Sequence, residues 1–357
     1  MKSWMWNAAA VALLAALAVA LGGDGQCPVA PYRYPLTQRT GTDDEIAALE
    51  ERIARSPEGL DLAALSRACL RQARQTGKRR WIDQAEAAAR RSLEILPVSN
   101  AGALLALAHA AQMTHDFAGS IALCDRVLEA RPRDAGALSL KATAQLGLGE
   151  LDDAIRTADA LVDRLPISEH LALRAVVRSA RGEEREALLD FRKALAVEEP
   201  GDPEGSAWLR AMWARQALRR GRRNEADDLL REALRIRPFL PLALGLQGDL
   251  ELDRGRLDEA DGAYADAYRA SGDPVFLARR ARANPAAADE LRAAAEKAMR
   301  ESGDHPLALA RLLLDRGTPD AVKEALTLAE SESRVRRNAE TLETLARARA
   351  AVRKLRT

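Results

Sequence analysis

A spacing of 34 residues recurs through the middle of this chain and limits what it can fold into. Pro132, Pro166 and Pro200 stand 34 residues apart, and so do Gly221 and Gly255. A fixed period of this length is typical of repeat architectures, in which one small unit stacks on the next copy of itself. We therefore expect an array of similar units rather than a fold built around one central core.

Five units share this register, and each reads as an apolar helix, a short turn, a second apolar helix and a stop. The units are residues 101–134, 135–168, 169–202, 207–240 and 241–274, and their turns carry His115, Gly149, Gly182, Gly221 and Gly255. Small residues recur where the paired helices must cross, because a close crossing leaves little room for side chains. These small residues are Ala108, Ala142, Ala214 and Gly248 on the first helices and Ser120, Ala154, Ala226 and Ala260 on the second.

This pattern resembles the tetratricopeptide repeat (TPR) family. Each repeat of the family has one small residue, two alanines and a proline at fixed positions. Unit 207–240 has Ala214, Ala226, Ala233 and Pro238 at these positions. Unit 241–274 matches with Gly248, Ala260, Tyr264 and Ala267, but has Gly272 at the proline position. The resemblance implies an all-α fold: a right-handed superhelical solenoid of antiparallel helix pairs, with capping helices at its ends.

The resemblance extends outward at lower quality, so that the solenoid is expected to cover residues 43–357. Divergent repeats are predicted at 60–97, 275–301 and 305–332, with an extra helix at 43–56 in front and a C-terminal helix at 336–355. The last helix is rich in arginine, which suits the polar outer face that a terminal repeat needs. Such an array leaves no room for a separate catalytic domain.

Residues 1–21 are typical of a signal peptide or an N-terminal membrane anchor. Lys2 precedes an apolar run from Ala8 to Leu21, and Ala18-Val19-Ala20 is a small-x-small site of the kind that signal peptidase accepts. At about 1.5 Å per residue this run spans about 21 Å, short of a hydrocarbon core of about 30 Å, which favours a cleaved signal over an anchor.

Residues 22–42 follow as a tether rich in glycine and proline, without a helical period. Lipid attachment at Cys27, within this tether, is a third alternative for the N-terminal region. In each case we expect an exported protein, either periplasmic or anchored to the membrane and facing the periplasm.

The composition favours helices and argues against a nucleic-acid partner. Aromatic residues make up 4% of the chain, and its 54 Lys and Arg nearly balance its 53 Asp and Glu, for a net charge of +1. A balanced chain has no overall attraction to nucleic acid. The densest basic run, Arg219-Arg220-Gly221-Arg222-Arg223, falls at an expected turn and lacks a ladder of aromatic residues for stacking bases.

No motif for catalysis, a cofactor or a metal is found. The sequence has no H-E-x-x-H, C-x-x-C, Walker A, G-x-G-x-x-G or G-x-S-x-G. His109, His115 and Cys124 share one unit, but we do not expect them to form a metal site. His115 stands in the turn and Cys124 on a core face, so their side chains should point apart. Cys69 and Cys124 fall on apolar helix faces and are expected to be buried, and a Cys27–Cys69 disulfide in an oxidising compartment stays open.

In the TPR family the first helices line a concave groove, and the resemblance implies which residues do so here. The predicted groove residues are Leu105, His109, Met113, Arg181, Trp208, Arg215, Arg219, Asp249 and Asp253. The same family positions are also held by Gly102, Gln112, Gly136, Ser139, Thr143, Leu146, Gly147, His170, Leu173, Val177, Ala180, Ala211, Leu218, Leu242, Gly245 and Leu252. The groove would be apolar at its start, basic in its middle and acidic at its end. The family's clamp for C-terminal carboxylates needs Lys and Asn, whereas His109 and Thr143 stand at one of the positions concerned.

Two interpretations of the basic zone stay open. An arginine can bind a carboxylate through two parallel hydrogen bonds and a tryptophan offers a flat anchor, so the zone would suit a peptide with an acidic residue beside an apolar one. Alternatively, Arg215 and Arg219 pair with Asp249 and Asp253 of the next unit and close the groove on itself.

We therefore expect a non-enzymatic scaffold that binds a peptide or protein partner in its groove, without a cofactor. The excess of 47 Arg over 7 Lys is typical of a GC-rich bacterial genome, which, with the export signal, points to the cell envelope. The alternatives are a structural or assembly factor of an envelope complex, acting through its convex face or terminal helix, and a regulatory subunit of a catalytic partner.

Overall fold

The structure, a computed structural model, describes residues 42–199 and 201–355. The predicted signal segment and Cys27 lie outside these residues, as does the tether up to residue 41. In the described part of the chain, no helix is both long enough and apolar enough to span a membrane.

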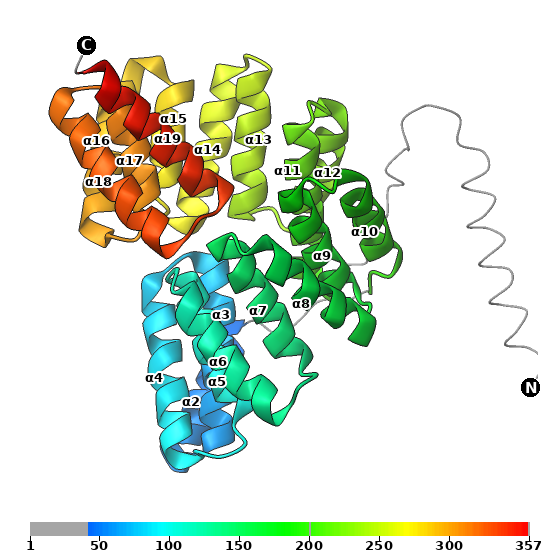
Figure 1. Ribbon diagram of the computed structural model, residues 1–357. Helices are drawn as coiled ribbons and strands as arrows, with labels where there is room; N and C mark the ends of the chain where they lie inside the picture. Colours follow the sequence, from blue (N-terminus) through cyan, green and yellow to red (C-terminus); the bar gives the residue numbers. More distant parts are fainter. Residues whose placement is uncertain (1–41, 200, 356–357) are drawn as a thin grey trace, which may run out of the picture. The chain divides into compact units, whose positions relative to one another are not determined.

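Eighteen α-helices and one short 3-10 helix follow one another through the described residues, without a strand (Figure 1). They are α2 (Thr42–Arg55), α3 (Gly59–Thr76), α4 (Arg79–Ile95), α5 (Ala101–Met113), α6 (Phe117–Ala130), α7 (Ala135–Leu148), α8 (Leu151–Arg164), α9 (Ser168–Arg181), α10 (Glu184–Ala196), α11 (Pro203–Arg219), α12 (Arg223–Ile236), α13 (Pro241–Asp253), α14 (Leu257–Ser271), α15 (Val275–Ala283), η1 (Pro285–Ala287), α16 (Ala288–Ser302), α17 (Pro306–Arg316), α18 (Pro319–Val335) and α19 (Ala339–Lys354). The predicted all-α fold is confirmed.

The helices pack as successive pairs, from α3 with α4 to α17 with α18, and α19 packs on the last pair. The first helices of neighbouring pairs also contact one another, so that α3, α5, α7, α9, α11 and α13 form a continuous inner row. Each pair therefore buries its apolar faces against the next, as in a solenoid.

Polar caps and left-handed residues mark where the helices begin and end. The side chains of Asn100, Asp116 and Asp134 accept hydrogen bonds from backbone N–H groups in the first turns of α5, α6 and α7. Gly149 ends α7 with a φ of 86°, and His115 takes the same left-handed region with a φ of 62°. The turn position predicted from the period is therefore the one where the backbone reverses direction.

The small residues at the helix crossings are buried, as their spacing predicts. Ala142, Ala154, Ala214 and Ala226 are all fully buried. A Cβ atom built on Gly248 would lie 2.4 Å from the Tyr264 ring, so the tyrosine occupies the space that a side chain on α13 would need.

Trp213 lies in the core, as expected for its position on α11. It is 6% exposed and stacks on Phe191 of α10, with the ring centroids 5.8 Å apart. Cys69 and Cys124 are free thiols with fully buried side chains.

The residues that interrupt the period lengthen one helix. Residues 203–206 separate the third and fourth predicted units, and they form the first turn of α11. Asp202 caps this turn through a hydrogen bond from the Gly205 N–H, and Pro203 supplies the fixed φ that suits a first helical position.

The C-terminal part of the array contacts turns in its N-terminal part. The Arg337 N–H donates to the Leu148 carbonyl at 2.7 Å, and the Asn338 amide donates to the Gly147 carbonyl at 3.0 Å. We call these contacts between the end of α7 and the α18–α19 loop the clasp. Arg79 and Asp304 form a further pair, 3.3 Å apart, between distant units.

Candidate functional site

A cavity of about 640 Å³ lies along the inner row of helices, and we call it the inner cavity. Its wall is formed by α3, α7, α9, α11, the start of α13 and the α12–α13 loop. Of the positions that the family pattern predicts for the groove, Ser139, Thr143, Leu146, Leu173, Trp208, Arg215 and Leu242 line it, and the others do not. A volume of this size can hold several side chains of a bound segment.

Apolar side chains form most of the cavity wall between α9 and α11. Leu173 and Met212 are each 7% exposed and present their edges to the cavity, while Trp208 is partly buried. Phe239, on the α12–α13 loop, is 75% exposed and lines the same space. A partly buried tryptophan beside an exposed phenylalanine can bury the side chains of a ligand.

Arg215, near the C-terminal end of α11, forms the basic end of the inner cavity. It is partly buried, and no hydrogen bond or ion pair to its side chain is found among the described residues. Burial lowers the pKa of Arg215, and the neighbouring Arg219 lowers it further, while Glu340 acts in the opposite direction.

Glu169, Asp202 and Glu204, near the N-terminal end of α11, form the acidic end of the inner cavity. Glu204 accepts a hydrogen bond from Gln75 at 2.6 Å and lies 3.4 Å from Arg237. The pKa of Glu169 is raised, although its side chain keeps contact with solvent. Partial burial is the largest cause, followed by the charge of the nearby Asp202, while the Arg74 charge lowers it.

The predicted groove residues on α5 do not line the inner cavity. Leu105 packs over Gly136, and Met113 packs against the N-terminal core. His109 is partly buried, and its burial, together with the Arg74 charge, lowers its pKa from 6.5 to about 4. His109 is therefore a neutral side chain at pH 7.

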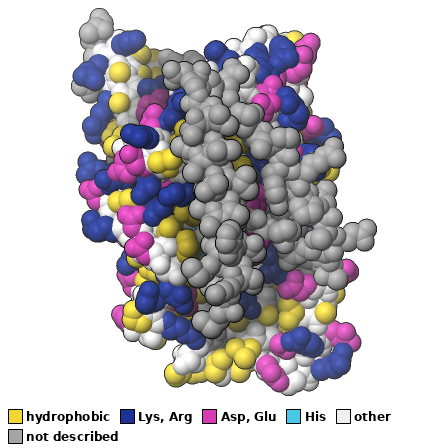
Figure 2. Space-filling model, turned by 90° about the vertical axis from the view of Figure 1, so that its right-hand side faces the viewer, with side chains coloured by type: hydrophobic (Ala, Val, Ile, Leu, Met, Phe, Trp, Pro, Cys, Tyr) yellow, Lys and Arg dark blue, Asp and Glu magenta, His cyan; other side chains and the backbone are white. Residues whose placement is uncertain are grey.

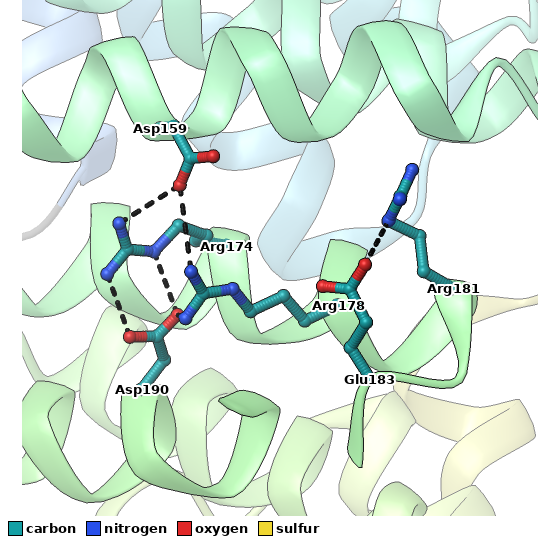
Figure 3. Close-up of polar contacts among 6 residues, drawn as sticks. All are labelled: Asp159, Arg174, Arg178, Arg181, Glu183 and Asp190. Carbon is teal, nitrogen blue, oxygen red and sulfur yellow. Dashed lines mark hydrogen bonds and ion pairs between the residues drawn. The ribbon is translucent and has the colours of Figure 1, made fainter. Parts of the chain in front are cut away.

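Arg181 is held by neighbouring carboxylates instead of facing the cavity. Its guanidinium pairs with Asp152 of α8 and with Glu183 of the α9–α10 turn. Figure 3 shows the Glu183 contact beside a second network, in which Arg174 and Arg178 of α9 bridge Asp159 and Asp190. Asp190 is 1% exposed, so these arginines stabilise the packing of α8, α9 and α10.

The two acidic groove residues have partners other than Arg215 and Arg219. Asp249 accepts hydrogen bonds from the Tyr264 hydroxyl at 2.7 Å and from Arg279 at 2.9 Å. Asp253 pairs with Arg223. The alternative in which Arg215 and Arg219 close the groove on these aspartates is therefore wrong, and in the described structure Arg219 is exposed.

Several residues of the inner cavity were missed at the level of sequence. Arg74 and Gln75 come from α3, in a divergent repeat, and Arg237 and Phe239 come from a loop between units. Glu204 belongs to the stretch that breaks the period, and Asp202 is the last residue before it. The repeat pattern predicts which residues lie on a given face of a helix, so it does not predict residues in loops or insertions. The Pro-Phe pair at 238–239 is nevertheless visible in the sequence as an apolar residue in a turn.

On the face shown in Figure 2, outside the grey residues, basic and acidic side chains are interspersed. This agrees with the balanced composition and with many ion pairs between neighbouring helices. Among residues 42–199 and 201–355, no group of three His, Cys, Asp or Glu side chains is arranged to hold a metal ion.

No family model and no curated protein matches this sequence. Among solved structures, the APC/C hetero-tetramer Cut9-Hcn1 matches 87% of this chain and 60% of that chain, with a TM-score of 0.51 at 15% identity. This chain thus spans about 60% of the length of that relative.

An IFIT1 monomeric mutant with Gppp-AAAA also matches 87% of this chain, and 86% of its own, with a TM-score of 0.51 at 12% identity. A thermophilic TPR protein in Thermus thermophilus is 25% identical over 51% of this chain and 98% of that chain, with a TM-score of 0.46. By its likeness to the Cut9-Hcn1 and IFIT1 structures and by its own stacked helix pairs, this chain has the fold of a tetratricopeptide repeat protein.

Proposed function

We propose that this protein is a non-enzymatic scaffold that binds an extended segment of a protein partner in its inner cavity. The observation that carries the proposal is the cavity itself, which opens along the inner faces of α7, α9 and α11 with Trp208 and Phe239 in its wall. Arg215 adds a charged group for which the described chain supplies no partner. Apolar anchors beside a few polar groups are the usual make-up of a binding site.

The test is affinity capture from an envelope extract with the wild-type chain and with a Trp208→Ala variant. The matched control is Trp81→Ala, because Trp81 is also partly buried but lies on α4, outside the cavity wall. Circular dichroism must first show that all three proteins are folded. We expect a partner that is lost with Trp208→Ala and kept with Trp81→Ala.

A partner that both variants retain would contradict binding in the inner cavity. It would favour an assembly factor that acts through the convex face or through α19. A partner with an enzymatic activity that changes when this chain is added would favour a regulatory subunit.

We also propose that the protein is exported and works in the bacterial cell envelope, in the periplasm or attached to the membrane. The support is the sequence of residues 1–21, with Lys2 and the apolar run that follows it. A fusion of residues 1–42 to alkaline phosphatase, which is active only after export, should give activity. Deleting residues 2–21 from the fusion should abolish it, and an inactive full fusion would contradict export.

A further inference from the structure

Arg215 differs from the other arginines that the structure describes. Arginines at or near the surface, such as Arg181 and Arg223, are paired with carboxylates or are exposed. Among the described residues, Arg215 alone is partly buried with neither a hydrogen bond nor an ion pair. A partly desolvated guanidinium beside a second arginine is electrostatically costly, and an anion bound there would relieve this cost.

The acidic end of the cavity has the opposite imbalance. Three carboxyl groups, of Glu169, Asp202 and Glu204, face two guanidinium groups, of Arg74 and Arg237. Glu204 is matched by Gln75 and Arg237. Glu169 and Asp202 both line this end, and neither forms an ion pair with a Lys or Arg of the described residues, although Asp202 accepts the Gly205 N–H that caps α11. A cation of the ligand would reduce the repulsion between these two carboxylates.

The distance between the two ends follows from the geometry of α11. Asp202 and Arg215 are thirteen positions apart along this helix, which at about 1.5 Å per residue is roughly 20 Å. An extended chain advances about 3.3 Å per residue, so this span equals about six residues. The charged side chains of the ligand are long and reach toward both ends of the cavity. The two charged residues of the peptide therefore need to be only about five residues apart.

We propose that the inner cavity binds an extended peptide with two opposite charges about five residues apart: a basic side chain at the acidic end and an acidic side chain at the basic end. Apolar side chains between them lie on Leu173, Trp208 and Met212. The apolar wall supplies affinity, and the two charged ends fix the direction in which the peptide lies. This inference rests on the proposed function and defines the class of its ligand.

The test is selection from a library of random octapeptides displayed on cells, with the full chain as bait. We expect wild-type protein to enrich peptides with Lys or Arg four to six positions from Asp or Glu, in one fixed order. A synthetic peptide from this set should bind at least tenfold more weakly to wild type when its acidic residue is replaced by the matching amide. With Arg215→Gln, the same replacement should change the affinity less than twofold.

The control is Arg192→Gln, because Arg192 is an exposed arginine of α10 outside the cavity wall. This variant should select the same peptides as wild type. The comparison of acidic and amide peptides on wild-type protein needs no variant, so it decides the matter even where Arg215→Gln does not fold.

The two ways of failing are distinguishable. Peptides that need Trp208 but show no spacing between charges would overturn this inference and leave the proposed function in place. Selection that enriches no peptide dependent on Trp208 would overturn both.

Discussion

At the scale of the residue, the arginines show how far a repeat pattern can predict a site. The period predicts the helix face on which a residue lies, and Arg215 and Trp208, which share the predicted inner face, both line the inner cavity. Arg181 shares that face by position, but Asp152 and Glu183 hold its guanidinium. Whether an arginine is paired depends on the carboxylates that neighbouring helices bring within reach, and the period says nothing about these.

His109 makes the stability of the protein depend on pH. Because burial lowers its pKa to about 4, the folded chain resists a proton that the unfolded chain accepts near pH 6.5. The stability from neutral His109 is therefore complete above pH 6.5 and is lost as the pH falls toward 4, by up to about 3 kcal/mol. The measurement is urea unfolding at pH 7.5 and pH 5, where His109→Gln should lose less stability than wild type. An NMR titration that places the pKa of His109 near 6.5 would contradict this account.

A buried ion pair between α11 and the segment before it was not expected from the sequence. Arg210 and Glu198 are joined by two hydrogen bonds of 2.6 and 2.9 Å, and their side chains are 2% and 3% exposed. Removing one partner leaves the other buried and unpaired, so Glu198→Gln should lower the free energy of unfolding by about 3–5 kcal/mol. The double variant Glu198→Leu/Arg210→Met should recover much of that loss in urea unfolding. Equal losses in the single and the double variant would mean that the pair makes no such contribution.

At the scale of the element, the sequence predicts most of what the structure shows. Turns, helix crossings and caps depend on residues close together in the chain, and the repeated period reports them several times over. The lengthened start of α11 is the exception, since residues 203–206 add a turn of helix that the other units lack. That added turn carries Glu204 of the acidic end and is capped by Asp202, which explains why the acidic end was missed.

The crossing of α11 and α12 can be tested at Ala226. Ala226 is fully buried, so Ala226→Phe should overpack the crossing and lower the free energy of unfolding by about 1–3 kcal/mol. Ala196→Phe is the matched control, because Ala196 is an exposed residue of α10. Thermal unfolding of both variants should show a loss at Ala226 only, and a similar effect at the two sites would speak against close packing at this crossing.

At the scale of the whole array, the clasp shows what the sequence leaves out. Asn338 donates to Gly147, which lies 191 positions earlier in the chain. Such a contact depends on the small rotation between neighbouring repeats, added up over many units. No local pattern encodes that sum, so neither the clasp nor the approach of α3 to the inner cavity could be predicted from the period.

Alanine substitutions at two glycines distinguish the contribution of the clasp to stability from the backbone strain at a turn. Gly149 and Gly182 have similar φ values, 86° and 80°, so an alanine at either site meets about 1–2 kcal/mol of backbone strain. A Cβ on Gly149 would also lie 2.7 Å from the Arg337 backbone, while nothing lies within 4 Å of a Cβ on Gly182. Gly149→Ala should therefore lower the urea midpoint more than Gly182→Ala does.

Asn338→Asp tests the same contact from its other side. An aspartate keeps the oxygen that caps α19 through the Thr341 N–H, but it loses the amide that donates to Gly147. If Gly149→Ala already opens the clasp, adding Asn338→Asp should cost less than it does alone, whereas its effect should simply add to that of Gly182→Ala. Additive losses in both double variants would mean that the two sides of the clasp act independently, and that the ends of the array are held together by other contacts such as Arg79 with Asp304.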